Sequence, residues 1–320
     1  MDRLMHKIKV HNIGNADCIR IKLNNGKQIL FDYAHMGDSD DDEDRTCNLP
    51  QEIRDDLGRR DHFDVVAFTH LDKDHYARAT EFFYFEHIKK YQDDVDGEPR
   101  IKMDVLWVPA AVITEALAKD ADPEAKAIQK EARERFKAKK GVRVFSRPAR
   151  LAKWCEDNDV DLDERRHLIT DAGQVAPEFG LSSDDVEFFV HSPFAMRQDE
   201  NTVEDRNNDA LVMQATFGAG GETTKVFLAS DVDHAVLTDI VTVTENKKNQ
   251  SRLEWDVFKL PHHCSHHALS GKEREGDKSE PEPKVARLFE HYGQEGCIVV
   301  STSDPISRRC PERADAFDWV

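Results

Sequence analysis

The stretch His70-Leu71-Asp72-Lys73-Asp74-His75 decides how this chain is interpreted, because four of its six residues are metal-type ligands. It follows Val65-Val66-Ala67-Phe68, an apolar run of the length of a buried strand, so we expect the ligands in a tight turn at a strand end. Imidazole nitrogens and carboxylate oxygens that alternate in one turn can face two adjacent cations. A polar surface loop is the alternative, and the position directly after a buried strand favours a metal site.

Two later segments also place ligands where an apolar strand ends. Residues 226–230 run into Asp231, a carboxylate suited to bridge two cations. Residues 257–261 run into His262-His263-Cys264-Ser265-His266-His267, and four histidines in six residues are typical of metal or acid–base sites. Asp32 ends an earlier strand, where it is expected either to orient the metal turn from behind or to cap a turn.

Composition predicts a single large domain over residues 1–320, because no linker of Pro, Gly or Ser and no internal repeat divides the chain. The formal charge of −18 argues against a broad basic surface for nucleic acid, although it allows a local basic groove. Part of this acidity lies in residues 38–44, which we expect to form a solvated loop.

Cysteine usage and hydropathy predict a cytoplasmic location. The six cysteines form no CxxC pair, which favours reduced thiols. Residues 1–7 lack the apolar core of a signal peptide, and no apolar run is long enough to span a membrane.

Alternating and apolar runs predict ten strands and three helices, of which one follows the metal turn and has as candidate buried positions Ala77, Phe82, Phe83, Phe85 and Ile88. The other two helices are expected to flank the sheets. The strands are expected at 7–13, 18–23, 28–31, 63–69, 105–108, 186–190, 211–217, 226–229, 257–260 and 298–301, and the helices at 50–60 and 284–292. Residues 114–170 read as a charged helical insertion, with Ala125, Ile128, Ala132 and Phe136 as one apolar stripe. This order suits an α/β fold in which two packed sheets carry helices on their outer faces.

The motifs, taken in order, resemble the metallo-β-lactamase fold, and within it the hydrolase domain of the ComEC DNA-uptake proteins and their soluble relatives. Asn12 to Asp17 is similar to the opening of that branch, and Leu30-Phe31-Asp32 to its first motif. Residues 70–75 resemble its signature turn, with aspartate where most of the superfamily has a second histidine. Residues 207–212, 228–231 and 260–265 resemble its paired asparagines, its bridging aspartate and its paired histidines. The resemblance implies an αββα sandwich of two mixed β-sheets.

By this resemblance the chain would hold two divalent metal ions, Zn or Mn. The implied ligands are His70, Asp72 and Asp231 for one ion, and Asp74, His75, Asp231 and one of His262 or His263 for the other. We favour His263 of that pair.

Three departures from the family pattern leave parts of the site open. The usual third-motif histidine is missing, since Asn207 and Asn208 occupy its place, and His191 is either a replacement ligand or a core-edge histidine. Cys264 stands where the branch has glycine, so the turn differs or a thiol approaches the metal. Residues 301–305 lack the histidine that usually follows, which leaves open an incomplete site or a fragment.

The carboxylate-rich ligand set predicts hydrolysis of a phosphodiester, because hard cations suit phosphoryl oxygens and lower the pKa of a water held between them. Asp74 is expected among the catalytic residues. His266 or His267 would donate a proton to the leaving oxygen, or both would support the metal turn.

The substrate is left open between DNA and a small phosphodiester. The family resemblance favours a nuclease, with the basic residues at 133–147 as a local groove, although a solvated helix face is the alternative. A β-lactamase or a thioesterase is also compatible with the resemblance. The second function we expect, from a different class, is a catalytically weak interaction subunit that binds a protein partner through residues 114–170.

Overall fold

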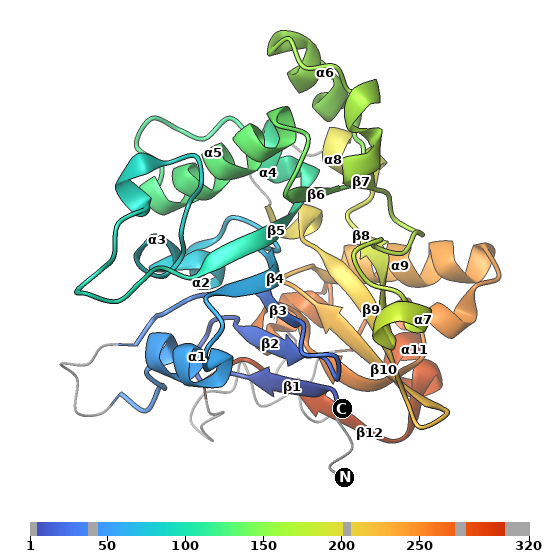
Figure 1. Cartoon of the computed structure of the whole chain (residues 1–320). Helices are drawn as coiled ribbons and strands as arrows, with labels where there is room; N and C mark the ends of the chain where they lie inside the picture. Colours follow the sequence, from blue (N-terminus) through green and yellow to red (C-terminus); the bar gives the residue numbers. More distant parts are fainter. Residues whose placement is uncertain (1–4, 38–43, 201–205, 273–279, 305–320) are drawn as a thin grey trace.

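Two mixed β-sheets form the centre of the computed structural model, which describes residues 5–37, 44–200, 206–272 and 280–304 (Figure 1). The first sheet follows chain order: β1 (Lys7–Val10), β2 (Ile19–Lys22), β3 (Gln28–Phe31), β4 (His62–Ala67), β5 (Lys102–Pro109), β6 (Val142–Phe145) and β7 (Ile169–Thr170). The strands from β1 to β3 pair antiparallel, and those from β3 to β7 pair parallel.

The second sheet has the order β12-β11-β10-β9-β8. Its strands are β8 (Val186–Ser192), β9 (Val212–Ala219), β10 (Glu222–Ala229), β11 (Trp255–Lys259) and β12 (Gly293–Val300). The strands β8, β9 and β10 pair antiparallel, whereas β10, β11 and β12 pair parallel. Every strand expected from the sequence is found, with shifted ends, among these and the strands of the first sheet.

Helices flank the two sheets. Their bounds are α1 (Leu49–Leu57), α2 (Lys73–Tyr76), α3 (Ala79–Phe82), α4 (Ala110–Thr114), α5 (Pro123–Lys137), α6 (Ala149–Asp157), α7 (Leu181–Asp184), α8 (Ala195–Glu200), α9 (His234–Asn246), α10 (His266–Leu269) and α11 (Pro283–Tyr292). The helices predicted at 50–60 and 284–292 correspond to α1 and α11. The helix expected to follow the metal turn as far as Ile88 is wrong in extent, because α3 ends at Phe82.

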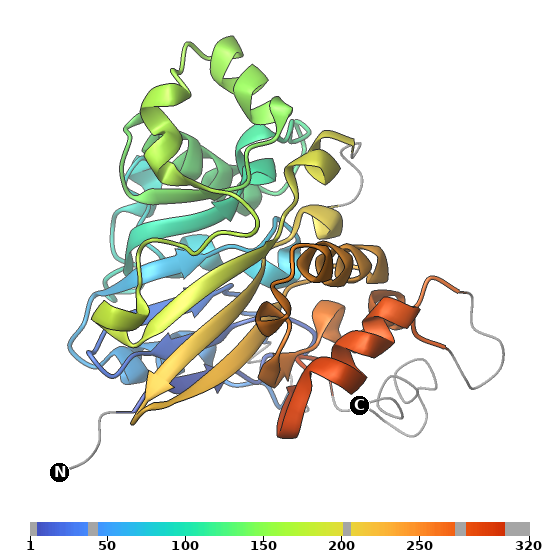
Figure 2. The ribbon, with the colours of Figure 1, turned by 90° about the vertical axis from the view of Figure 1, so that its right-hand side faces the viewer.

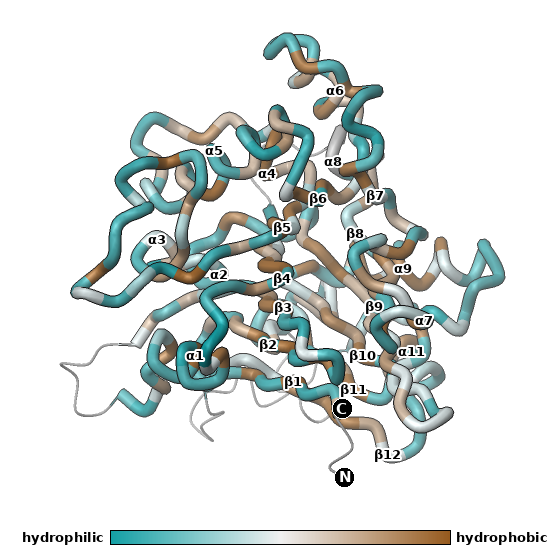
Figure 3. The backbone as a smooth tube through the Cα atoms, in the orientation of Figure 1, coloured by the Kyte–Doolittle hydropathy of each residue, from teal (hydrophilic) through white to brown (hydrophobic). Residues whose placement is uncertain are grey.

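Three apolar clusters show how the layers pack. The cluster between the sheets joins residues of both, such as Phe31 and Trp107 with Phe188 and Met213. A second cluster lies between the first sheet and helices including α1 and α5, and a third lies between the second sheet and helices α9 and α11. Figure 2 shows α9 and α11 on the outer side of the second sheet, and Figure 3 shows hydrophobic residues along the central strands. This layering is compatible with the predicted αββα sandwich.

The segment 114–170 is not wholly helical, so that part of the prediction is wrong. Its helices α5 and α6 alternate with β6 and β7, which extend the first sheet. The predicted apolar stripe of α5 is confirmed, because Ala125, Ile128, Ala132 and Phe136 are all buried. Of the predicted acidic loop at 38–44, only Asp44 lies within the described residues.

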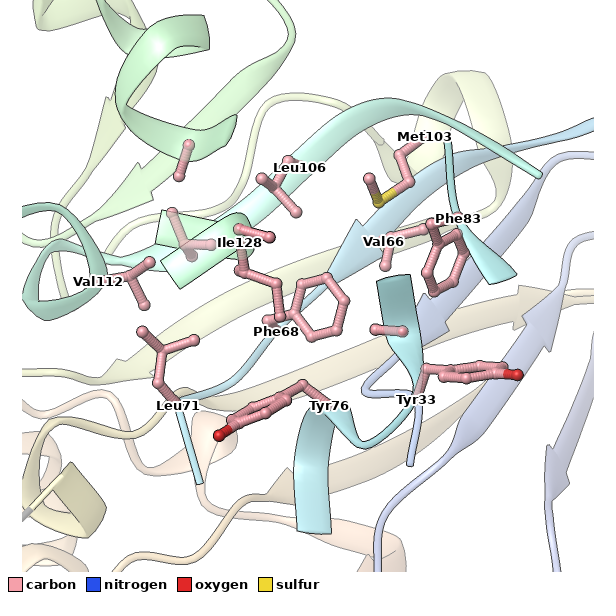
Figure 4. Packing of buried hydrophobic residues seen from close by; sticks show 14 of the residues in the cluster. Tyr33, Val66, Phe68, Leu71, Tyr76, Phe83, Met103, Leu106, Val112 and Ile128 are labelled. Carbon is pink, nitrogen blue, oxygen red and sulfur yellow. The ribbon is translucent and has the colours of Figure 1, made fainter. Parts of the chain in front are cut away.

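The turn at 70–75 is fixed to the core beneath it. Leu71 and Tyr76 are 2% and 4% exposed, and both belong to the cluster that includes Phe68 and Ile128 (Figure 4). These two apolar side chains pack into the cluster and anchor the turn, so the polar residues between them are held just beyond the end of β4. The apolar positions of the turn therefore position its ligands.

Candidate metal centre

Four side chains converge where the parallel strands of both sheets end. Asp74 and His75 follow β4, Asp231 follows β10 and His263 follows β11, and their ligand atoms all lie within 4.8 Å of one another. His75 Nε2 lies 3.2 Å from Asp231 Oδ2, and His263 Nε2 lies 3.3 Å from the same oxygen and 3.0 Å from Asp74 Oδ2. The carboxyl ends of one strand of the first sheet, β4, and of two neighbouring strands of the second, β10 and β11, thus bring together the residues predicted for one of the two cations.

Asp32 orients His75 from behind, as the sequence predicted. Its Oδ1 accepts a hydrogen bond from the Thr69 N–H at 2.8 Å, and its Oδ2 accepts one from the Thr69 hydroxyl at 2.7 Å. The same Oδ2 lies 2.8 Å from His75 Nδ1. A proton held on Nδ1 by this carboxylate leaves Nε2 directed at Asp231, which is the arrangement of a metal-ligating histidine.

A hydroxyl pair joins the two sheets beside this contact. Ser230, at the end of β10, donates to Thr69 Oγ1 at 2.7 Å, and both residues are buried. Because Thr69 also holds Asp32, the position of the carboxylate behind His75 depends on both sheets. The chain thus positions the imidazole through a buried hydrogen-bond network rather than through a single contact.

His70 and Asp72 form a second, less complete group. His70 Nε2 is buried without a hydrogen-bond partner and lies 3.6 Å from Asp72 Oδ2. Arg206 donates to Asp72 Oδ1 at 3.1 Å and also pairs with Glu115 at 2.7 Å. Among the described residues, no third ligand joins His70 and Asp72 within the distance that unites the first four.

The paired histidines after β11 differ in their positions. His263 lies in the four-residue group, and its Nδ1 lies 3.1 Å from the Thr302 hydroxyl. His262 is half-buried and does not belong to the group, so the preference for His263 agrees with the geometry. The backbone is left-handed at His262, His263 and Cys264, with φ of 48°, 50° and 65°. A glycine would adopt this conformation without strain, whereas Cys264 adopts it with a side chain.

Several other predicted site residues lie outside the four-residue group. His191 is not a ligand: its Nε2 lies 2.8 Å from the Arg252 carbonyl oxygen, and its ring stacks on Phe227 in the outer core. Burial lowers the pKa of His191 to about 4, so it is a neutral core histidine. Cys264 is buried but does not belong to the group of metal-type ligands.

The asparagines and the last two histidines have separate environments. Asn207 and Asn208 lie in a short helical turn, Arg206–Asp209, and the Asn207 Oδ1 is buried without a hydrogen-bond partner. His266 is half-buried and His267 is exposed on α10, with their rings 5.5 Å apart. Neither histidine belongs to the four-residue group.

Two buried charges at the centre were not predicted as site residues. Lys259, in β11, is 3% exposed, donates a hydrogen bond to Asp17 and lies 4.0 Å from Asp231 Oδ1. Asp17 is also buried, and its backbone N–H binds the Asp74 carbonyl oxygen at 3.0 Å. A lysine that interrupts an apolar strand directly before paired histidines is the sequence signal that could have identified Lys259.

The buried carboxylates and histidines shift each other's protonation. Burial on its own would lower the pKa of His75, but the charges of Asp231 and Asp32 raise it well above its ordinary value. Burial would also lower the pKa of His263, but Asp231 and Asp74 raise it to about 9. Burial would raise the pKa of Asp231, but the nearby His75, His263 and Lys259 lower it. Without a metal, protons on these imidazoles compensate the carboxylates.

The basic stretch at 133–147 does not form an open basic surface. Arg135 and Arg143 are 3% and 6% exposed, and they pair with Glu131 and Glu178. The other members also have partners: Arg133 binds backbone carbonyls, and Lys137, Lys139, Lys140 and Arg147 form ion pairs. The side chains of Lys139, Lys140 and Arg147 are 43%, 70% and 43% exposed in these pairs, so phosphate binding by this stretch stays a prediction beside the solvated helix face.

Comparison with known proteins does not identify the chain. No protein-family model matches it, and no curated protein is similar to it. Within the described residues, no helix combines the length and apolarity needed to cross a membrane.

Proposed function

We propose that this chain is a metal-dependent hydrolase of phosphodiesters, with the metallo-β-lactamase fold and closest to the ComEC-like branch. The observation that carries the proposal is the convergence of Asp74, His75, Asp231 and His263 from separate strand ends within 4.8 Å. A salt-bridge network in a protein core also brings charges together, but it has no need for two imidazoles that face one carboxylate oxygen.

The residues present fit a divalent cation. The His75 Nε2 and Asp231 Oδ1 atoms are buried and have no hydrogen-bond partner, which is costly unless another group compensates them. Two imidazole nitrogens and two carboxylates are ligands that both Zn²⁺ and Mn²⁺ accept. A second cation would be held by His70 and Asp72 with Asp231, and it would bind more weakly because this group is less complete.

A cation bound at this centre would supply an activated water and would neutralise negative charge on the leaving oxygen. The residues of the chain prepare the site for it. Asp32 fixes the orientation of His75, and Thr302 contacts His263 Nδ1. Arg206, which is held by Glu115, donates a hydrogen bond to the carboxylate of Asp72. His266 and His267, on α10 just beyond His263, are the candidate proton donors for the leaving oxygen.

The phosphodiester class rests on the hardness of the ligand set. Carboxylate ligands favour hard cations, and hard cations bind phosphoryl oxygens well. The compensated basic stretch and the net charge of −18 favour a small phosphodiester over long DNA.

The test compares metal-stripped protein with protein supplied with Mn²⁺ or Zn²⁺ on bis-p-nitrophenyl phosphate and on single-stranded DNA. We expect metal-dependent hydrolysis that Asp231→Asn and His263→Asn abolish and that His262→Asn reduces far less. His262 is the matched control because it precedes His263 with the same backbone conformation. Wild-type protein that hydrolyses neither substrate with either metal, while hydrolysing nitrocefin or a thioester, would overturn the assignment.

A specific observation keeps a second function open, namely a catalytically weak interaction subunit. The Arg206 guanidinium occupies one oxygen of Asp72, and the third-motif histidine is missing. Metal content distinguishes the two functions. About one or two more tightly bound cations per chain in the wild type than in Asp231→Asn favour the hydrolase, whereas equal metal content of the two proteins after metal-replete purification favours the interaction subunit.

A further inference from the structure

A second group of metal-type ligands lies apart from the centre, between the end of β1 and the start of α1. It consists of His11, Cys47 and Glu52, whose ligand atoms lie within 4.8 Å of one another. We infer that this group binds a soft divalent cation of the Zn²⁺ class, with a water as the fourth ligand. The proposed function uses none of these three residues.

Backbone contacts hold the three ligands in place. The His11 N–H donates to the Cys18 carbonyl oxygen at 3.0 Å, which continues the pairing of β1 with β2. The Cys47 N–H donates to the Asn12 carbonyl oxygen at 2.8 Å, so the thiol lies beside His11 although 36 residues separate them in the chain. Glu52 lies in the first turn of α1, a helix that begins at the Asn48 cap. Three separate segments therefore deliver the ligands.

The spacing of the ligands suits one small cation. His11 Nδ1 lies 3.1 Å from Glu52 Oε2, close to the roughly 3.3 Å between two ligands of a tetrahedral Zn²⁺ with bonds near 2 Å. His11 is 4% exposed and its Nε2 is buried without a hydrogen-bond partner, so Nδ1 is the nitrogen that faces the carboxylate. Cys47 and Glu52 are partly exposed, which leaves the site open to solvent on one side.

The protonation of His11 and Cys47 bears on how they would bind a cation. Burial and Lys9 lower the pKa of His11, which keeps the imidazole in the neutral form that binds metals. Burial and the Glu52 carboxylate raise the pKa of the Cys47 thiol to about 11, because they outweigh the opposing effect of Lys9. A bound Zn²⁺ would stabilise the thiolate directly.

Lys9 is the group that the cation would displace. Its ammonium lies 2.8 Å from Glu52 Oε2 and 2.9 Å from Asp56 Oδ2, and its side chain is 40% exposed. When Glu52 turns to a cation, Lys9 keeps its pair with Asp56. Release of Glu52 therefore leaves no buried charge unpaired.

The ligand set also determines which metal this site would select. A thiolate with an imidazole favours Zn²⁺ and Co²⁺ over Mn²⁺ or Mg²⁺, whereas the centre at Asp231 offers only nitrogen and oxygen. Co²⁺ bound to a thiolate gives a charge-transfer band in the near ultraviolet, and Co²⁺ at a nitrogen–oxygen site does not. Spectroscopy can therefore separate the two sites without any assay of activity.

The experiment titrates the full-length, metal-stripped protein with Co²⁺. We expect a thiolate charge-transfer band whose final amplitude corresponds to one thiolate-bound Co²⁺ per chain, which disappears in Cys47→Ser and persists in Asp231→Asn. Cys264→Ser is the matched control, because Cys264 is the thiol beside the other centre. A wild-type protein without the band would overturn the inference, as would a band that survives Cys47→Ser and is lost in Cys264→Ser.

A second measurement needs no variant and covers the case in which Cys47→Ser does not fold. Iodoacetamide labelling at mildly alkaline pH, mapped by mass spectrometry, compares Cys47 with the exposed Cys297 in the same molecule. Zn²⁺ should slow the labelling of Cys47 about tenfold or more and leave Cys297 unchanged, because a metal-bound thiolate is a poor nucleophile. Equal labelling of Cys47 with and without Zn²⁺ would contradict the proposed site.

Discussion

Replacing Asp32 by Asn should separate folding from metal binding. In the wild type the two carboxylate oxygens of Asp32 accept hydrogen bonds from Thr69 and from His75 Nδ1. An asparagine of the same shape has one acceptor and one donor group. If its carbonyl oxygen keeps the buried Thr69 N–H, its NH₂ group faces His75 Nδ1, which must then accept. The remaining ring proton moves to Nε2, the nitrogen that should bind the metal.

The structure sets the size of both effects. A hydrogen bond to a charged acceptor contributes roughly 1.5–3 kcal/mol and a neutral one about 1 kcal/mol, so the loss of the buried charge should destabilise the metal-free protein by about 2–4 kcal/mol. Disturbing a partner behind a metal-ligating histidine costs roughly 10–100-fold in metal affinity. Asp32 adopts φ of 57°, which Asn tolerates as well as Asp does, so backbone strain adds little.

Calorimetric titration with Zn²⁺ and Mn²⁺, together with urea unfolding, measures both quantities. Asp256→Asn is the matched control, because the Asp256 carboxylate also accepts a backbone N–H, from Lys225 at 2.7 Å, but does not belong to a group of metal-type ligands among the described residues. It should lose stability and keep its metal affinity. A folded Asp32→Asn protein that binds metal as tightly as the wild type would refute the reasoning that Asp32 sets the tautomer of His75.

Three further predictions follow from the same centre. Lys259→Met leaves buried carboxylates without their ammonium and should reduce the free energy of unfolding, measured with urea, by about 3–5 kcal/mol. The control Lys225→Met, at a half-exposed pair with Glu254, should change the free energy of unfolding by less than about 1 kcal/mol. The raised pKa of His263, about 9, stabilises the metal-free protein fully below pH about 6.5, and this stability is lost as the pH rises to about 9. Metal affinity should rise over that same window, with proton release visible by calorimetry in buffers of different ionisation enthalpy; a pH-independent affinity would contradict it. Leu71→Ala, which opens a cavity under the metal turn, should cost about 2–5 kcal/mol, and an unchanged thermal midpoint would show that the turn is held by other contacts.

The strands and their ligands could be predicted from the sequence because apolar runs and the residues that end them are local features. The strand β6 could not, since Arg143 interrupts its four residues and resembles part of a basic surface stretch. The guanidinium is buried only because Glu178, 35 residues away, binds it. A local pattern contains no information about such a distant partner.

Histidines at strand ends illustrate the same limit for the site. Both His191 and His263 lie at or just after the end of an apolar strand, and the sequence gives no reason to separate them. In the structure the ring of His191 lies against Phe227 in the outer core, and that of His263 faces Asp231. The difference depends on the face of the sheet to which each side chain points, and the packing of the layers determines that face. Lys259 was missed for a related reason, because its partner Asp17 lies 242 residues away.

Charge balance at the centre bears on how many cations it holds. Its inner charged groups are four carboxylates, one ammonium and two imidazoles with raised pKa: Asp17, Asp32, Asp74, Asp231, Lys259, His75 and His263. With both imidazoles protonated, the group carries one net negative charge. Exchange of those two protons for one divalent cation leaves that charge unchanged, so the buried environment need not reorganise to accept the metal. A second cation would make the group positive, and one oxygen of its expected ligand Asp72 already accepts a hydrogen bond from Arg206. The first cation should therefore bind tightly with release of about two protons, and the second only when a phosphoryl group brings negative charge of its own.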